Sequence, residues 1–234
     1  MYIVDNIKPS SEGIEDTKKD IDFEYFDSYY ELHKKFIQPL DIKIDISKFE
    51  HEIEKYHSLF RTWDQNRPHL PRYGISLVND DGDINKKIDL GCAVFDHRNK
   101  NLPVEKHLHE RLFKVKTEVL SSLDSLRPLD VIGEFMLRSN ILLWHKGASF
   151  LPHLDTFPKL SSNLRLWGVN DVKNYVFRTA DGDCMVNVEP GRIYLIDTTK
   201  FHYAKALENW IYTFFLALDN TDACYQKLKE LLIE

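Results

Sequence analysis

The hydrophobic period of the sequence changes near residue 131, and this change constrains the fold more than any other feature. From there to residue 218, apolar residues recur at every second position in short runs. Turn-forming residues such as Gly147, Pro158 and Gly191 separate these runs. About eight short strands with regular turn signals predict a β-sandwich, a jelly roll or a barrel. The runs cover residues 131–145, 149–155, 163–169, 174–178, 184–188, 192–197, 201–207 and 210–218.

Before residue 131, apolar residues more often recur at helical intervals. In residues 15–62, apolar side chains at helical intervals predict two amphipathic helices, broken around Pro39. A stripe of leucines and valines predicts a third helix over residues 104–123, and residues 73–78 predict a short strand. The first half of the chain has few core residues, so we expect it to pack on the β core rather than to fold alone.

These patterns predict a single domain of the α+β class, mainly β with flanking helices. A helical and loop-rich part, residues 1–130, is expected to pack on a β core formed by residues 131–219. Residues 220–234 predict a C-terminal helix, with Thr221 as a possible N-cap.

The net charge, the length of the apolar runs and the number of cysteines indicate which partners and compartment to expect. Lys and Arg number 31 and Asp and Glu 37, and the resulting net charge of −6 disfavours a nucleic-acid partner. No apolar run approaches the ~20 residues that span a bilayer, so no membrane partner is expected. The three cysteines, Cys92, Cys184 and Cys224, are scattered and predict neither a disulfide framework nor a cysteine-based zinc site. We therefore expect a cytoplasmic protein.

One short motif carries the chemistry. His153 and Asp155 are two residues apart at the end of a predicted strand, so their side chains should share a face. A rolled sheet can bring His202, four or five predicted strands later, beside them. Two histidines and one carboxylate on one face of an octahedron form the facial triad of non-haem Fe(II) oxygenases. These three residues are therefore the predicted metal ligands and catalytic residues.

Two other interpretations of the motif remain open. His-x-Asp occurs by chance in many proteins, and His153 could be a surface residue hydrogen-bonded to Asp155. A zinc hydrolase with the same three ligands would need a general base near the metal, and none stands out in the local sequence.

Several blocks together resemble a known family. GASFLPHLDT at 147–156, NLRLWGVN at 163–170, VEPGRIYLIDTTKFHYA at 188–204 and an apolar strand ending in ALD at 217–219 are similar to the Fe(II)/2-oxoglutarate-dependent oxygenases. Within that superfamily, the chain most resembles the aspartyl/asparaginyl β-hydroxylase branch, which includes bacterial proline hydroxylases. The resemblance covers roughly residues 131–219 and leaves residues 1–130 unmatched.

The resemblance implies a fold, a cofactor set and an activity. The core would be a double-stranded β-helix, a cupin-like jelly roll, with iron held by His153, Asp155 and His202. The enzyme would use Fe(II), O2 and 2-oxoglutarate as cosubstrate to hydroxylate an unactivated C–H bond. By branch, the partner would be a small-molecule or peptide substrate resembling an amino acid.

The cation that should hold the far carboxylate of 2-oxoglutarate is missing from its usual place. The family carries an arginine about ten residues after the distal histidine, but Tyr212 and Thr213 occupy that region here, and their hydroxyls are expected to add hydrogen bonds to the cosubstrate. Arg165 is the expected replacement, because alternation puts it on the inward face with Trp167. It also matches an arginine that the branch uses for the cosubstrate. The alternative interpretation makes Arg165 a solvent-facing edge residue.

Other cations and another function class are weaker alternatives. Arg138, Arg178, Arg192 and Lys205 could replace Arg165 as the anchor. The stiff segment 67–74, with two prolines, could cover the barrel mouth and bind an acidic part of the substrate, or be a surface turn. The missing late arginine also supports a cupin-like metal- or small-molecule-binding or sensing protein without oxygenase turnover.

Overall fold

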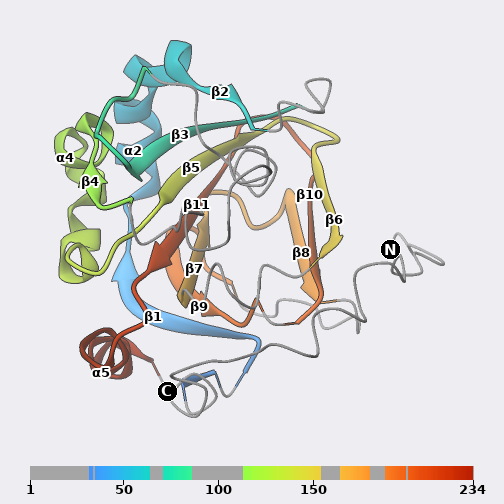
Figure 1. Ribbon diagram of the computed structural model, residues 1–234. Helices are drawn as coiled ribbons and strands as arrows, with labels where there is room; N and C mark the ends of the chain where they lie inside the picture. Colours follow the sequence, from blue (N-terminus) through green and yellow to red (C-terminus); the bar gives the residue numbers. More distant parts are fainter. Residues whose placement is uncertain are drawn as a thin grey trace, which may run out of the picture.

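A computed structural model describes residues 32–33, 35–63, 71–85, 113–153, 164–179, 188–198 and 200–233. Within these ranges the chain forms two sheets that face each other, with short helices on the outer side of the larger one (Figure 1). The core is therefore mainly β with flanking helices, arranged as a jelly roll, as the two-residue period predicted. No helix in this part of the chain is long and apolar enough to cross a membrane.

The larger sheet has eight strands and mixes segments from both halves of the chain. Its order is β1-β9-β7-β11-β5-β3-β2, with β4 paired to β3. Each pairing in this sheet is antiparallel. The strands are β1 (Ile37–Lys43), β2 (Arg61–Thr62), β3 (Arg72–Asn79), β4 (Val115–Lys116), β5 (Ser139–Trp144), β7 (Leu164–Val169), β9 (Arg192–Ile196) and β11 (Ile211–Leu218).

The smaller sheet has three described strands in the order β6-β10-β8: β6 (Ser149–His153), β8 (Tyr175–Thr179) and β10 (His202–Ala206). The space between the two sheets is filled by a cluster that includes Trp144, Trp167, Phe177 and Tyr194. A second, larger cluster lies between the eight-stranded sheet and the helices. Each of the longer strands β1, β5, β7, β9 and β11 therefore has one face toward the jelly-roll interior and one toward the helices.

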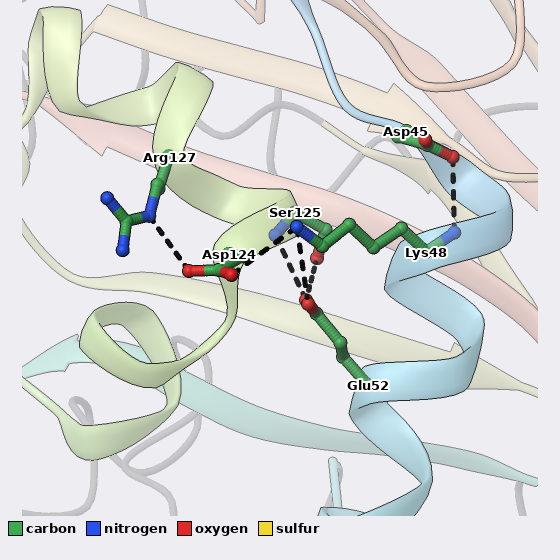
Figure 2. Close-up of polar contacts among 6 residues, drawn as sticks. All are labelled: Asp45, Lys48, Glu52, Asp124, Ser125 and Arg127. Carbon is green, nitrogen blue, oxygen red and sulfur yellow. Dashed lines mark hydrogen bonds and ion pairs between the residues drawn. The ribbon is translucent and has the colours of Figure 1, made fainter.

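Polar contacts hold two of the helical elements against each other (Figure 2). The helical elements are α2 (Ile46–Ile53), η2 (Glu54–Leu59), α4 (Glu118–Ser122), η5 (Asp124–Ile132) and α5 (Asp222–Leu231). Asp45 caps α2 by accepting a bond from the Lys48 backbone N–H. Glu52 of α2 accepts hydrogen bonds from the backbone N–H and hydroxyl of Ser125 in η5, at 3.0 and 2.7 Å. Because these groups join segments far apart in sequence, they fix η5 against α2.

Two predicted helices need correction. Pro39 was expected to break a helix, but it lies within strand β1. β1 is an edge strand of the larger sheet, and an edge strand tolerates a residue without a backbone N–H. Of the helix predicted over 104–123, residues 113–117 are not helical and include β4, and only Glu118–Ser122 are α-helical. Residues 104–112 and 15–31 lie outside the described part of the chain.

The boundary expected at residue 131 does not divide the sheet. β1, β2, β3 and β4 all precede it and pair within the eight-stranded sheet. The helix at α2 and the strand at β3 lie where the spacing predicted them. The C-terminal helix is α5, and Thr221 caps it by accepting a bond from the Cys224 backbone N–H. The run at 184–188 falls almost entirely outside the described residues.

Candidate metal centre

The structure brings His153 and His202 together across the smaller sheet. The two residues are direct partners in the antiparallel pairing of β6 and β10. Their ring centroids lie 4.5 Å apart, with the ring planes at 49°. His202 is buried, with 4% of its surface exposed. The two imidazoles are thus close enough to bind one metal ion, for which histidine bonds are near 2 Å.

An irregularity in β6 aims His153 at its partner. His153 pairs with His202 and Phe150 pairs with Ala204, so β6 carries one more residue than β10 over this stretch. Such a bulge lets residues three apart share a face, and the Phe150 and His153 rings indeed lie 5.5 Å apart. Leu151, inside the bulge, points outward and is 62% exposed.

Both imidazoles are oriented by the same local hydrogen bond. Nδ1 of His153 lies 2.6 Å from the carbonyl oxygen of Leu151, and Nδ1 of His202 lies 3.0 Å from that of Lys200. A carbonyl oxygen only accepts hydrogen bonds, so each Nδ1 carries the proton. In the neutral ring, Nε2 then carries the lone pair. Histidines that bind metals in proteins commonly donate their other N–H to a carbonyl in this way, so the pair fits a metal ion.

The third predicted ligand lies beyond the described residues. Asp155 falls in the segment 154–163, which the structure does not describe. Within the ranges that are described, no group of three or more His, Cys, Asp or Glu side chains could hold a metal ion. The described residues therefore supply two of the three predicted ligands.

Aromatic side chains surround the histidine pair. The ring of His202 lies 5.6 Å from that of Phe177 and 6.5 Å from that of Phe36, and Phe150 lies against His153. Apolar walls of this kind exclude water and strengthen electrostatic interactions inside a site.

Arg165 lies inside the jelly roll, on the expected face. Leu164 and Leu166 belong to the core beneath the helices, whereas Trp167 belongs to the interior cluster. Arg165 is 4% exposed, and its guanidinium carbon lies 5.6 Å from the ring centroid of Phe215. The alternative that made it a solvent-facing edge residue is therefore wrong.

Tyr212 and Thr213 point to opposite faces of β11. The Tyr212 hydroxyl lies 2.6 Å from Nε2 of His57, and its ring packs edge-on against Phe49 beneath the helices. Burial raises the pKa of Tyr212, and the charges of nearby glutamates act in the same direction. Thr213 faces inward, where its Oγ1 accepts a hydrogen bond of 2.9 Å from Nε1 of Trp144. Grouping the two hydroxyls in one site was wrong, since neighbours on a strand alternate.

The alternative cations differ in exposure. Arg192 lies at the β1–β9 edge, where it pairs with Glu189 at 3.2 Å. Lys205 is exposed and Arg178 is partly buried. Arg138, just before β5, is 9% exposed.

The sequence placed Arg72 only within segment 67–74, as part of a possible cover of the barrel mouth, and missed that its side chain lies in the interior; residues 67–70 of that segment lie outside the described part of the chain. Arg72 is the first residue of β3 and is 2% exposed. Its guanidinium carbon lies 3.8 Å from the ring centroid of Phe150. The signal was present in the sequence, because Ile75 and Leu77 alternate with Arg72, Gly74 and Ser76, which places the arginine on the face opposite the apolar residues.

Among the comparisons with known proteins, only the one with solved structures found matches. No family model and no curated protein matches the sequence. An oxidoreductase of the 2OG-Fe(II) oxygenase family from Burkholderia pseudomallei has a TM-score of 0.40 at 14% identity, over 84% of this chain and 90% of that chain. A Pseudomonas putida prolyl-4-hydroxylase has a TM-score of 0.39 at 13% identity, over 79% and 92%. An RmlC-like cupin from Desulfovibrio desulfuricans has a TM-score of 0.28 at 11% identity, over 36% and 73%. Function must therefore be inferred from the residues of this chain.

Proposed function

We propose that this protein is an Fe(II)- and 2-oxoglutarate-dependent dioxygenase that hydroxylates an unactivated C–H bond of an amino acid or a peptidyl residue. The observation that carries the proposal is the facing pair His153 and His202, with both Nδ1 atoms bonded to backbone carbonyls. With Nδ1 of each ring oriented in this way, each Nε2 would be the atom that binds the metal, from adjacent strands.

His153, Asp155 and His202 would hold the iron. Two histidines and one carboxylate leave open positions for a cosubstrate and for O2. Bound iron would supply the activation of O2, which protein side chains cannot provide. The chain itself would orient both imidazoles and keep the site dry with the rings of Phe36, Phe150 and Phe177.

The jelly-roll interior has the charge that an acidic cosubstrate needs. Arg72 and Arg165 both point inward and are almost fully buried. A buried carboxylate is costly unless it is paired, and arginine pairs with it through two parallel hydrogen bonds. Arg165 is the proposed cosubstrate residue from β7, and Thr213 offers a hydroxyl on the same inward face of the sheet.

The decisive experiment is succinate formation from 2-oxoglutarate by the purified chain with Fe(II) and O2, with and without candidate amino acids. His202→Ala should abolish it. His145→Ala is the control, because His145 lies in the turn between β5 and β6 and packs against Tyr73 and Trp210. Full succinate formation by His202→Ala would contradict the proposal.

A second function is favoured by one feature of β11. Its sequence, IYTFFLAL, contains no cation, so the usual anchor of the oxygenases is absent from the last strand. A cupin-like protein that binds a metal and an acidic small molecule without turnover would also use the histidine pair and the interior arginines. Metal and 2-oxoglutarate binding without any succinate would support this alternative.

A further inference from the structure

We infer that Arg72 of β3 binds the far carboxylate of the acidic cosubstrate, in place of the cation that is absent from β11. The inference rests on the proposed function and goes beyond it by naming the residue that binds the far carboxylate, the end of the cosubstrate away from the metal. It also transfers this role from Arg165, to which the sequence assigned it.

Arg72 enters the interior from the part of the chain that the sequence placed outside the β core. β3 pairs with β5, and Arg72 lies directly opposite Trp144. Trp144 belongs to the interior cluster, whereas Ile75 and Leu77 of β3 belong to the core beneath the helices. The side chain of Arg72 therefore leaves the sheet on the interior side.

The ring of Phe150 contacts both the Arg72 guanidinium and the ring of His153. The Arg72 guanidinium carbon lies 3.8 Å from the centroid of Phe150, and that ring lies 5.5 Å from the ring of His153. A short diacid bound to the metal at its keto-acid end can extend along Phe150 and reach the guanidinium. The same stacking on Phe150 restricts the guanidinium, so less entropy is lost when it binds a carboxylate.

Hydroxyl groups accompany Arg72 at this end of the interior. Burial raises the pKa of Tyr175, and the positive charge of Arg72 acts against that rise, so the guanidinium lies within electrostatic reach of this hydroxyl. Thr213 accepts a bond from Trp144, the residue opposite Arg72, and can donate its own O–H. One cation with neutral donors beside it is a suitable environment for a buried carboxylate.

The two interior arginines enter the jelly roll at different positions along the sheet. Trp144, the partner of Arg72, pairs with Ile211 at the start of β11, whereas Arg165 pairs with Ala217 near its end. At ~3.3 Å per residue, these positions are about 20 Å apart along the strand. Arg165 also pairs with Ile196, where β9 ends and the chain crosses to His202. The backbone of Arg165 thus lies at the histidine end of the sheet, whereas Arg72 enters from the other end and extends its side chain to Phe150.

The test measures the preference for a second carboxylate. Full-length protein loaded with Mn(II) under anaerobic conditions would be titrated calorimetrically with 2-oxoglutarate and with 2-oxobutanoate, which has the keto acid but no far carboxylate. Arg72→Met should weaken 2-oxoglutarate binding about 100-fold, the effect of removing one partner of a buried charge pair. Binding of 2-oxobutanoate and of Mn(II) should stay unchanged.

Two further variants make the result specific. Arg72→Lys keeps the charge without the planar fork, so it should keep part of the preference for the diacid and also serves if Arg72→Met does not fold. Arg61→Met on the neighbouring strand β2 is the matched control, because this guanidinium bonds to the carbonyl of Ser58 instead. It should bind both acids like the parent protein.

Three outcomes would overturn the inference. Unchanged 2-oxoglutarate affinity in Arg72→Met would do so, as would equal losses for the diacid and the monoacid, which indicate a structural role. Loss of the diacid preference in Arg165→Leu but not in Arg72→Met would return the far carboxylate to Arg165 and leave the proposed function standing. A parent protein that binds Mn(II) poorly, or binds neither acid, would instead reject the proposed function itself.

Discussion

The imidazoles of His153 and His202 lie 4.5 Å apart although they come from strands far apart in the chain. We expect His153→Ala or His202→Ala to abolish binding of Fe(II), or of Mn(II) as its surrogate, because this pair provides two of the three proposed ligands. Calorimetric titration of the apo protein with Mn(II) measures the effect. Since a metal that binds only the folded state stabilises it, chelation should also lower the Tm of the parent protein.

His145→Ala provides the control for these variants. His145 is partly buried edge-on to Trp210, and this burial lowers its pKa. This variant should bind Mn(II) like the parent protein. Parent-like metal binding by both His153→Ala and His202→Ala would show that the ligands are misassigned.

Arg165→Leu should weaken cosubstrate binding in a pattern different from that of Arg72→Met. Because Arg165 lies toward the histidine end, its loss should reduce the affinity for 2-oxoglutarate and for 2-oxobutanoate alike, by about 3 kcal/mol, the cost of breaking a buried charge pair. Mn(II) affinity should remain nearly intact. Arg127→Leu, on the exposed side of η5, is the control and should change neither titration. Parent-like binding of both acids by Arg165→Leu would remove it from the site.

Gly191 is required where β9 begins beside β1. Its φ of 75° lies in the left-handed region, and an added Cβ would collide with the carbonyl oxygen of Ile44. Gly191→Ala should therefore lower the free energy of unfolding by more than about 2 kcal/mol in urea denaturation. Gly147→Ala is the matched control: its φ is 87°, but nothing lies within 4 Å of the added Cβ. It should cost about 1 kcal/mol, from backbone strain alone. Equal losses would mean that the Ile44 contact is unimportant.

The strands after residue 131 could be predicted because alternation is a local property. Leu164, Arg165, Leu166 and Trp167 show in sequence the two faces that they have in the sheet. β1 could not be predicted in this way. Pro39 is a helix breaker in any local interpretation, and only the pairing with β9 shows that it lies on an edge strand.

The site, like the fold, could be predicted only as far as local sequence patterns specify it. His202 could be matched with His153 because a rolled sheet returns the chain to its earlier strand. The bulge that turns His153 inward depends on the register between β6 and β10, which no short segment specifies. Arg72 was expected only in a loop over the barrel mouth because β3 precedes the expected core, although its own alternation placed it opposite the apolar face.

The link between α2 and η5 should depend on acid pH. Burial raises the pKa of Glu52, but its hydrogen bonds from Ser125 and the charge of Lys48 outweigh this, and the net result is a pKa below the ordinary value of 4.5 (Figure 2). A carboxyl whose pKa is lowered by folding stabilises the protein above its unfolded pKa, and this contribution is lost as the pH falls through the folded value. Glu52→Gln should therefore lower the free energy of unfolding by about 1 kcal/mol at pH 7. The difference from the parent should shrink steadily as the pH falls below 4.5.

Urea denaturation of both proteins between neutral and acid pH measures this difference. Asp80→Asn, in the exposed turn after β3, removes the same charge without these contacts and is the control. Its free energy of unfolding should follow that of the parent protein at every pH. If Glu52→Gln differed from the parent by the same amount at acid and neutral pH, the Glu52 carboxylate would not be the group that makes the link between α2 and η5 sensitive to pH.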